Sequence, residues 1–375
     1  MMRILLLDMD GVLLHPHGYQ ESLQDNVRLW GKLLGFGEAV LPLEDVLRFE
    51  SAGVSAEWIS GTMCVALMML TLWEHDPGIA VPSSLDAPLA PHGLPVPDLS
   101  AFAAELLAAS NHRDPAETGI RILTDRCTSP GHAAHVRALV EDSVDFERSL
   151  FHRVQQELVL GSDQLKSVYG VAPLLDIAGY LSTRDRPAVC ARTIARLLAW
   201  REEEGHAAAL MTNRPSRTPA GAGSPEAELG LQLLGLEALP FIGMGAIGEL
   251  AGPMSCTIED CLKPHAAHAL AAIRRAVGDD LALEMEAVRA LLQERRVDPA
   301  WRMLDGAEVI VVEDSANGCL SARAAQKVLG AAGIDIALNL LGVAGSDAKR
   351  TALEDAGAAL FASSEIALQE AIGRG

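Results

Sequence analysis

The sequence contains no run of basic residues, no C-x-x-C pair, no internal repeat and no low-complexity segment. Its 30 lysines and arginines are outnumbered by 50 aspartates and glutamates, which leaves a net charge of −20. Such a charge repels the phosphates of nucleic acids and of anionic lipid surfaces, so neither is an expected partner. It also repels phosphorylated small molecules at long range. Any site for such molecules must therefore supply its own cations.

Long apolar runs are also missing. The most apolar stretch, from Trp58 to Trp73, is interrupted by Ser60, Gly61 and Thr62 and is too short to cross a bilayer. The six cysteines are scattered, which is typical of reduced, buried thiols rather than of a disulfide scaffold. The first residues carry one arginine and a short apolar run that ends in acids, unlike a secretion signal. We therefore expect a cytoplasmic protein.

The chain is organised around its first apolar run, residues 2–7, which stops at Asp8, Asp10 and Gly11. A short continuous apolar run followed by a turn signal is what a central strand of a parallel sheet requires, because helices cover both faces of such a sheet. Open α/β sheets bind their ligands at the carboxyl ends of the strands. Asp8 and Asp10 are therefore predicted to share one small site.

Three further segments end in residues that suit the binding of phosphate or a metal ion. They are Thr212, Asn213 and Arg214 after the apolar run 207–211, Lys263 ahead of a predicted helix over 265–276, and Glu313 and Asp314 after the β-branched run 309–312. In this order and strand context, the four segments resemble the four motifs of the haloacid dehalogenase (HAD) superfamily. Most members of that superfamily are Mg²⁺-dependent phosphotransferases.

The resemblance implies an α/β fold with a Rossmann-like parallel-sheet core, formed by 1–14 and 188–375, and a large α-helical cap inserted at 15–187. The chain is long enough for two such domains, with 375 residues of which 49% are hydrophobic. The insertion exceeds the small cap of the β-phosphoglucomutase and phosphoglycolate phosphatase relatives. Its size leaves open an enlarged lid or a lid with an added surface for a homodimer.

Apolar residues at helical spacing predict where the insertion is helical. The expected helices span 20–34, 42–50, 55–74 with Ser55 as N-cap, 98–110 with Asp98 as N-cap, and 133–160 with a break, while 77–97 is a proline-rich connection and 161–179 is a turn-rich end of the cap. In the core, further strands are expected over 241–245, 334–343 and 358–361.

The resemblance also implies roles for the motif residues. Asp8 would attack phosphorus and form an aspartyl-phosphate, and Asp10 would protonate the leaving oxygen and later take a proton from water. Mg²⁺ suits the acids because it prefers hard oxygen ligands. The implied residues are Asp8, Asp10, Thr212 and Lys263 for catalysis, Asn213 and Arg214 for substrate binding, and Asp8, the main-chain carbonyl of Asp10, Glu313 and Asp314 for the metal.

These residues predict a Mg²⁺-dependent phosphatase that acts on a small phosphorylated metabolite. A phosphomutase of the β-phosphoglucomutase type fits the same motifs, and a non-catalytic binding protein on the same fold is a third alternative. A haloacid dehalogenase proper is less expected, because it uses a nucleophilic aspartate without a metal. The spacing of Cys256, Cys261, His265 and His268 also leaves open a zinc site, although it is not the spacing of a usual zinc finger.

Overall fold

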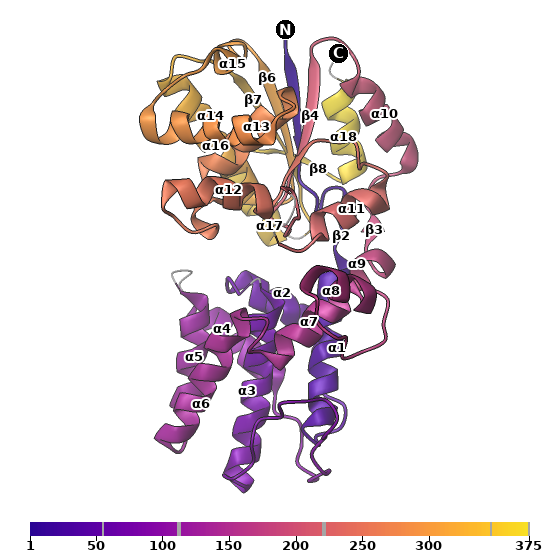
Figure 1. Ribbon diagram of the computed structural model, residues 1–375, viewed down its shortest axis with the longest axis vertical. Helices are drawn as coiled ribbons and strands as arrows, with labels where there is room; N and C mark the ends of the chain where they lie inside the picture. The colour runs from indigo at the N-terminus through magenta and orange to yellow at the C-terminus, as the bar shows by residue number, and fades with distance from the viewer. Residues whose placement is uncertain (55, 111–113, 220–222, 346, 374–375) are drawn as a thin grey trace. The chain divides into compact units, whose positions relative to one another are not determined.

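The computed structural model describes the whole chain except residues 55, 111–113, 220–222, 346 and 374–375. The chain forms two compact units (Figure 1). The first, called the α/β unit below, contains Met1–Pro16 and Asp185–Gly375, and the second, called the helical unit, contains His17–Arg184. From the sequence, the boundaries were expected after residues 14 and 187, which differ from these by two and three residues.

The α/β unit is built on a six-stranded parallel sheet in the order β5-β4-β1-β6-β7-β8. The strands are β1 (Arg3–Leu7), β4 (His206–Met211), β5 (Phe241–Ile242), β6 (Glu308–Glu313), β7 (Ala337–Val343) and β8 (Ala359–Phe361). Leu7 at the end of β1 lies opposite Leu210 of β4 and Val312 of β6. The predicted α/β fold class is therefore confirmed, although the strand expected over 241–245 is shorter because Met244 already begins a helix.

Helices cover both faces of this sheet. They are α10 (Ala191–Arg201), α11 (Glu226–Leu234), α12 (Met244–Met254), α13 (Ala266–Val277), α14 (Leu281–Glu294), α15 (Pro299–Arg302), α16 (Ala316–Ala331), α17 (Asp347–Asp355) and α18 (Ser364–Gly373), with a 3₁₀ turn, η2, at Glu259–Cys261. Ile4 and Leu6 belong to the core that includes α13 and α16, whereas Leu5 and Leu7 belong to the core that includes α10 and α18. Alternate residues of β1 thus face opposite helical layers, which explains why the whole strand is buried.

A second, two-stranded sheet was not predicted from the sequence. Its strands, β2 (Leu14–His15) and β3 (Arg186–Pro187), pair in antiparallel fashion. They lie at the two places where the chain leaves the α/β unit and returns to it. Strands of two residues carry no detectable alternation of apolar and polar side chains, so sequence pattern alone does not reveal them.

The helical unit is formed by α1 (His17–Leu33), α2 (Leu43–Ser51), α3 (Glu57–His75), α4 (Leu99–Ala109), α5 (Pro115–Asp125), α6 (Pro130–Glu141), the 3₁₀ turn η1 (Asp142–Val144), α7 (Leu150–Leu160), α8 (Ser162–Tyr169) and α9 (Tyr180–Thr183). The side chain of Asp98 caps α4 as predicted, by accepting a bond of 2.8 Å from the main-chain N–H of Ala101. Ala56 stands at the start of α3, and the expected cap, Ser55, lies outside the described residues.

The predicted helix over 133–160 is divided into α6 and α7, and α8 lies within the stretch 161–179 that the sequence marked as rich in turns. α5 was not predicted. The buried side chains of α3 belong to one apolar core with those of α1, α2 and α4 to α7. Among the helices that the structure describes, none combines the length and the hydropathy needed to span a membrane.

Candidate active site

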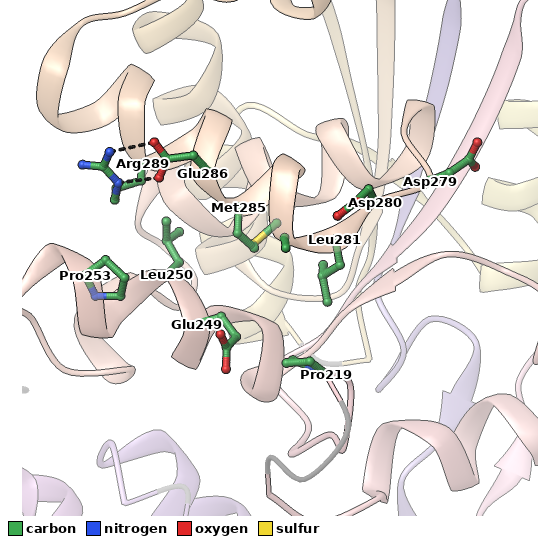
Figure 2. Close-up of a pocket in the computed structure, with 11 residues that line it drawn as sticks. Pro219, Glu249, Leu250, Pro253, Asp279, Asp280, Leu281, Met285, Glu286 and Arg289 are labelled. Atoms are coloured by element: carbon green, nitrogen blue, oxygen red, sulfur yellow. Dashed lines mark hydrogen bonds and ion pairs between the residues drawn. The ribbon is translucent and has the colours of Figure 1, made fainter.

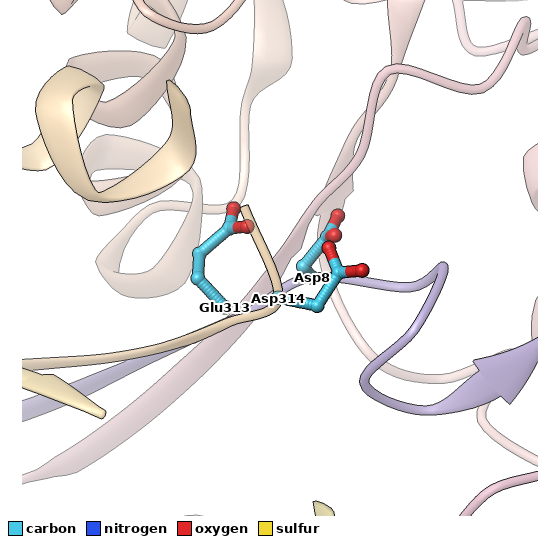
Figure 3. A group of neighbouring side chains, drawn as sticks. All are labelled: Asp8, Glu313 and Asp314. Atoms are coloured by element: carbon cyan, nitrogen blue, oxygen red, sulfur yellow. The ribbon is translucent and has the colours of Figure 1, made fainter. Parts of the chain in front are cut away.

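Three carboxylates meet at the carboxyl ends of β1 and β6. Asp8 directly follows β1, Glu313 ends β6 and Asp314 comes next. One ligand oxygen from each of the three lies within 4.8 Å of those from the other two. Figure 3 shows the three side chains. The main-chain N–H of Asp8 donates to the carbonyl of Val312 at 3.1 Å, which ties the end of β1 to β6. Parallel pairing of two adjacent strands therefore brings these acids together.

Two glycines make room for the cluster. Gly11 has a φ of +78°, and a Cβ atom there would lie 2.2 Å from Oδ2 of Asp314. A Cβ atom on Gly318 would lie 1.8 Å from Oε1 of Glu313. Both positions therefore require glycine for the close approach, and Gly11 also requires it for its left-handed backbone. The Asp-Gly end of the first motif and the glycine of the fourth thus have a direct structural cause.

Two lysines bind the three acids. Nζ of Lys263 donates to Oδ1 of Asp8 at 2.7 Å and to Oε1 of Glu313 at 2.5 Å, and all three side chains are buried or nearly so. Lys349 of α17 forms an ion pair with Oδ2 of Asp314. Lys349 was missed in the sequence, where it follows the end of the predicted strand 334–343 by six residues. Its place after a strand that reaches the same sheet edge is the signal that could have found it.

Two acids of this cluster, Asp8 and Glu313, are hard to ionise. Burial, followed by the charge of Glu313, raises the pKa of Asp8 well above its usual value, and Lys263 opposes this only in part. Burial likewise raises the pKa of Glu313. Burial disfavours the charged form of Lys263, but Asp8 and Glu313 outweigh it and raise the pKa of its ammonium above the usual range. When ionised, three carboxylates face two ammonium groups, and the cluster keeps one uncompensated negative charge.

The donor set fits Mg²⁺, which takes carboxylate oxygens in an octahedral shell with opposite ligands about 4.2 Å apart. The three acids, with oxygens within 4.8 Å of one another, are close to that size. The three acids are not equally suited as Mg²⁺ ligands, because both carboxylate oxygens of Glu313 already have protein partners. Lys263 donates to Oε1, and the hydroxyl of Ser315 donates to Oε2 at 3.0 Å. Asp8 and Asp314 are therefore better suited to bind a cation directly, and Glu313 is better suited to orient Lys263.

Asp10 is held by an arginine. Nε of Arg214 donates to Oδ1 and Oδ2 of Asp10 at 3.1 and 2.9 Å, and Nη2 donates to Oδ1 at 2.5 Å. The same Nη2 donates to Oδ2 of Asp185 at 2.8 Å, and the side chains of Arg214 and Asp185 are almost fully buried. Sequence reasoning expected Arg214 to face the substrate and did not identify Asp185. In the structure, the guanidinium binds two carboxylates of the protein and thereby orients Asp10.

Thr212 and Asn213 follow β4, the neighbour of β1. Because Leu210 lies opposite Leu7 in this pair, Thr212 lies beyond the same edge of the sheet as Asp8. Thr212 is buried, and its hydroxyl oxygen accepts the main-chain N–H of Arg214 at 3.1 Å, which leaves the hydroxyl proton for another acceptor. Asn213 is exposed.

The four residues considered for zinc do not form one group of ligands among the residues that the structure describes. Nδ1 of His265 accepts the main-chain N–H of Ala267 at 3.2 Å and caps α13. His268 is fully buried, and its burial lowers the pKa of the imidazole to about 3. Only the two sulfurs of Cys256 and Cys261 meet, at 3.0 Å.

A cavity of about 550 Å³ lies elsewhere in the α/β unit, between α12 and α14 (Figure 2). Leu250, Leu281 and Met285 contribute apolar surface, and Glu286 is paired with Arg289 at its rim. None of the predicted site residues lines this cavity. It is therefore separate from the acidic cluster.

Comparison with known proteins identifies a fold but no family. No family model and no curated protein matches the chain. An X-ray structure from the Northeast Structural Genomics Consortium is similar over 96% of this chain and 95% of its own, with a TM-score of 0.65 and 16% sequence identity. The phosphatase Tt82 from Thermococcus thioreducens aligns over 99% of this chain and 100% of its own, with a TM-score of 0.48 and 14% identity. The first similarity shows a shared fold, and the second is too weak to carry an argument.

Proposed function

We propose that this protein is a Mg²⁺-dependent phosphatase of the HAD superfamily that hydrolyses a small phosphate monoester through an aspartyl-phosphate on Asp8. The observation that carries the proposal is the meeting of Asp8, Lys263, Glu313 and Asp314 in one buried cluster, although they come from three separate segments of the chain. A purely structural role would not need three crowded acids, two of which, Asp8 and Glu313, are buried so that their charged forms are disfavoured.

Asp8 is the proposed nucleophile. Lys263 binds its Oδ1, and we assign attack on phosphorus to the second oxygen, Oδ2. The new bond from oxygen to phosphorus forms as the bond from phosphorus to the leaving oxygen breaks. The ammonium of Lys263 offsets the negative charge of the nucleophile and of the phosphoryl oxygens. A bound Mg²⁺, held by Asp8 and Asp314, would add the positive charge that keeps the acids ionised and neutralises the phosphate.

Asp10 is the proposed acid and base. Its carboxyl group would give a proton to the leaving oxygen and would then remove a proton from the water that attacks the aspartyl-phosphate. Arg214 fixes the carboxylate with bonds to both oxygens, and Asp185 fixes Arg214 in turn. Arg214 is therefore proposed as a positioning residue. Thr212, with its free hydroxyl proton, would donate to a phosphoryl oxygen.

The helical unit is inserted in the chain between the first and second motif segments. We assign to it the selection of the substrate, since its sequence supplies none of the motif residues and its position in the chain is that of a HAD cap. Its substrate is expected to be a small phosphorylated metabolite, because the net charge of −20 disfavours large polyanions.

The test is the release of inorganic phosphate from an aryl phosphate and from a panel of sugar, nucleotide and small-acid phosphates, with Mg²⁺ and with a chelator. We expect release that stops with the chelator and returns with added Mg²⁺. Isomerisation of a sugar phosphate without net release would instead establish the phosphomutase. If every substrate remains intact while Mg²⁺ still binds, the catalytic proposal is wrong and the protein is a binding protein.

A further inference from the structure

Cys256 and Cys261 are the part of the sequence pattern that the proposed function does not use. Cys256 follows α12, and Cys261 ends the 3₁₀ turn η2. Their sulfurs are 3.0 Å apart, which is closer than the roughly 3.5–4.0 Å at which non-bonded heavy atoms usually meet. Both cysteines are free thiols. The structure therefore holds two thiols in contact.

The loop between the two cysteines holds the sulfurs together. The carboxylate of Asp260 accepts the main-chain N–H of Thr257 at 3.1 Å and its hydroxyl at 2.8 Å. In return, the hydroxyl of Thr257 accepts the main-chain N–H of Asp260 at 3.2 Å. These bonds connect the first and the last of the four residues that separate the cysteines. Cys256 also packs against the apolar core to which Cys261 belongs.

The two thiols differ in their access to solvent. Cys256 is only partly buried, whereas the exposed fraction of Cys261 is 1%. Burial, and then the hydrogen bond with Cys256, raise the pKa of Cys261 to about 12. The outer thiol is therefore the one that a dissolved oxidant reaches first, and the inner thiol lies in contact with it.

We propose that Cys256 and Cys261 form a reversible intramolecular disulfide when the protein meets a peroxide. The thiolate of Cys256 attacks a peroxide oxygen, the O–O bond breaks, and a sulfenic acid forms with release of hydroxide. The sulfur of Cys261 then attacks the sulfenic sulfur, the S–S bond forms, and the departing hydroxide takes the proton of Cys261 as water. Two thiols and one hydrogen peroxide thus become one disulfide and two water molecules.

Formation of the disulfide is expected to affect the acidic cluster through Lys263. Its formation shortens the separation of the sulfurs from 3.0 Å to about 2.05 Å. Cys261 is two residues before Lys263, whose ammonium binds Asp8 and Glu313. If the protein is a phosphatase, as proposed above, oxidation should lower its turnover, and a dithiol reductant should restore it. Formation of the disulfide itself does not depend on the proposed function.

The test uses the native full-length protein, treated with hydrogen peroxide, blocked with an alkylating reagent, denatured and cleaved after glutamate. Cleavage at Glu249, Glu259 and Glu284 puts Cys256 in the peptide 250–259 and Cys261 in the peptide 260–284. We expect the two peptides to remain joined after oxidation and to separate after reduction. Alkylation of both cysteines after peroxide treatment, or a stable sulfinic acid on Cys256 with an alkylated Cys261, would overturn the proposal.

Cys190 provides a matched control. It is an exposed thiol whose polar neighbours are Thr193 and Glu365, with sulfur-to-oxygen distances of 3.6 and 3.5 Å. Cys256→Ser should abolish the joined peptides and the loss of turnover, whereas Cys190→Ser should change neither. If the two peptides are joined after oxidation of the wild type but turnover is unchanged, the disulfide is established and its proposed effect on Lys263 is wrong. Absence of phosphatase activity before oxidation would concern only the proposed function.

Discussion

Two buried acids, Glu157 in the helical unit and Asp8 in the α/β unit, have opposite surroundings. In the helical unit, the fully buried carboxylate of Glu157 accepts the hydroxyl of Ser162 at 2.6 Å and the main-chain N–H groups of Leu174 and Leu175 at 2.7 and 2.9 Å. In the α/β unit, Asp8 is crowded by two further acids and has a raised pKa. Glu157 is surrounded by neutral donors, whereas Asp8 shares its one lysine with a second acid, Glu313.

This contrast separates a structural acid from one that we propose to be functional. Glu157 connects α7 to the segment that follows α8, and its donors are neutral groups of the same unit. The cluster around Asp8 has more acids than lysines, and this excess supports our proposal that it binds a cation and a phosphoryl group. Burial alone therefore does not identify the site. The feature that marks the candidate site is the excess of carboxylates over ammonium groups.

The largest effect is expected when the charge of Lys263 is removed. Lys263→Met keeps the length of the buried chain but leaves Asp8 and Glu313 without their shared ammonium. We expect kcat to fall by about 10²–10³-fold, the usual loss for one electrostatic partner of the transition state. Steady-state release of phosphate measures it, and circular dichroism checks the fold. Turnover within threefold of wild type, a threshold well below about 10²-fold, would remove Lys263 from the site.

Replacement of Arg214 should depend on the leaving group. Arg214→Met releases the carboxylate of Asp10 from its fixed position. Protonation of the leaving oxygen matters for an alkyl phosphate and little for a nitrophenyl phosphate, so turnover should fall about 10²-fold with the first and much less with the second. Arg214→Lys should recover part of the loss.

The control for this comparison is Arg217→Met, since Arg217 is an exposed arginine three residues further along the chain. It should behave as wild type with both substrates. An equal loss with both substrates in Arg214→Met would mean that the arginine supports the fold rather than Asp10.

A smaller effect is expected from Asp314→Ala. Asp314 is a proposed metal ligand, so its loss should raise the Mg²⁺ concentration required for half-maximal activity by about tenfold or more. A Mg²⁺ titration of turnover measures this requirement. The control is Asp347→Ala, which removes an exposed acid of α17, the helix that carries Lys349. It should leave the Mg²⁺ titration unchanged. The same curve for Asp314→Ala and wild type would exclude a ligand role.

The smallest effect is expected in the helical unit. Glu157→Gln replaces a carboxylate oxygen by an NH₂ group that faces N–H donors, and one donor then loses its acceptor. The free energy of unfolding should fall by about 1–3 kcal/mol. Denaturant unfolding gives this value, and Glu147→Gln, at an exposed position of the same unit, is the control. A stability equal to that of wild type would show that Glu157 is not the structural acid described here.

The sequence was most informative where strands end. The apolar run before Asp8 and the β-branched run before Glu313 predicted two parallel strands, and their adjacency in the sheet brings the acids together. Lys349 and Asp185 were missed because each pairs with a residue far away in the chain, and tertiary packing determines such pairs. The orientation of Arg214 toward Asp10 was missed for the same reason.

In the helical unit, the pattern predicted most helices but not all of their limits. α5 begins with Asp114 as N-cap and Pro115 as first residue, so its start signal was present in the sequence. α8 is bounded by Gly161 and Gly170 and is only eight residues long. Its glycines predict turns, and tertiary packing stabilises a helix between them.

The central claim is tested most directly by comparing wild type with Asp8→Asn for phosphate release, each with Mg²⁺ and with a chelator. Asparagine keeps the shape of the side chain and removes its nucleophilic oxygen. We predict release by the wild type in Mg²⁺ alone and none by Asp8→Asn under either condition, with the fold of the variant intact. Substantial phosphate release by Asp8→Asn, or release by the wild type that is indifferent to the chelator, would contradict the proposed mechanism.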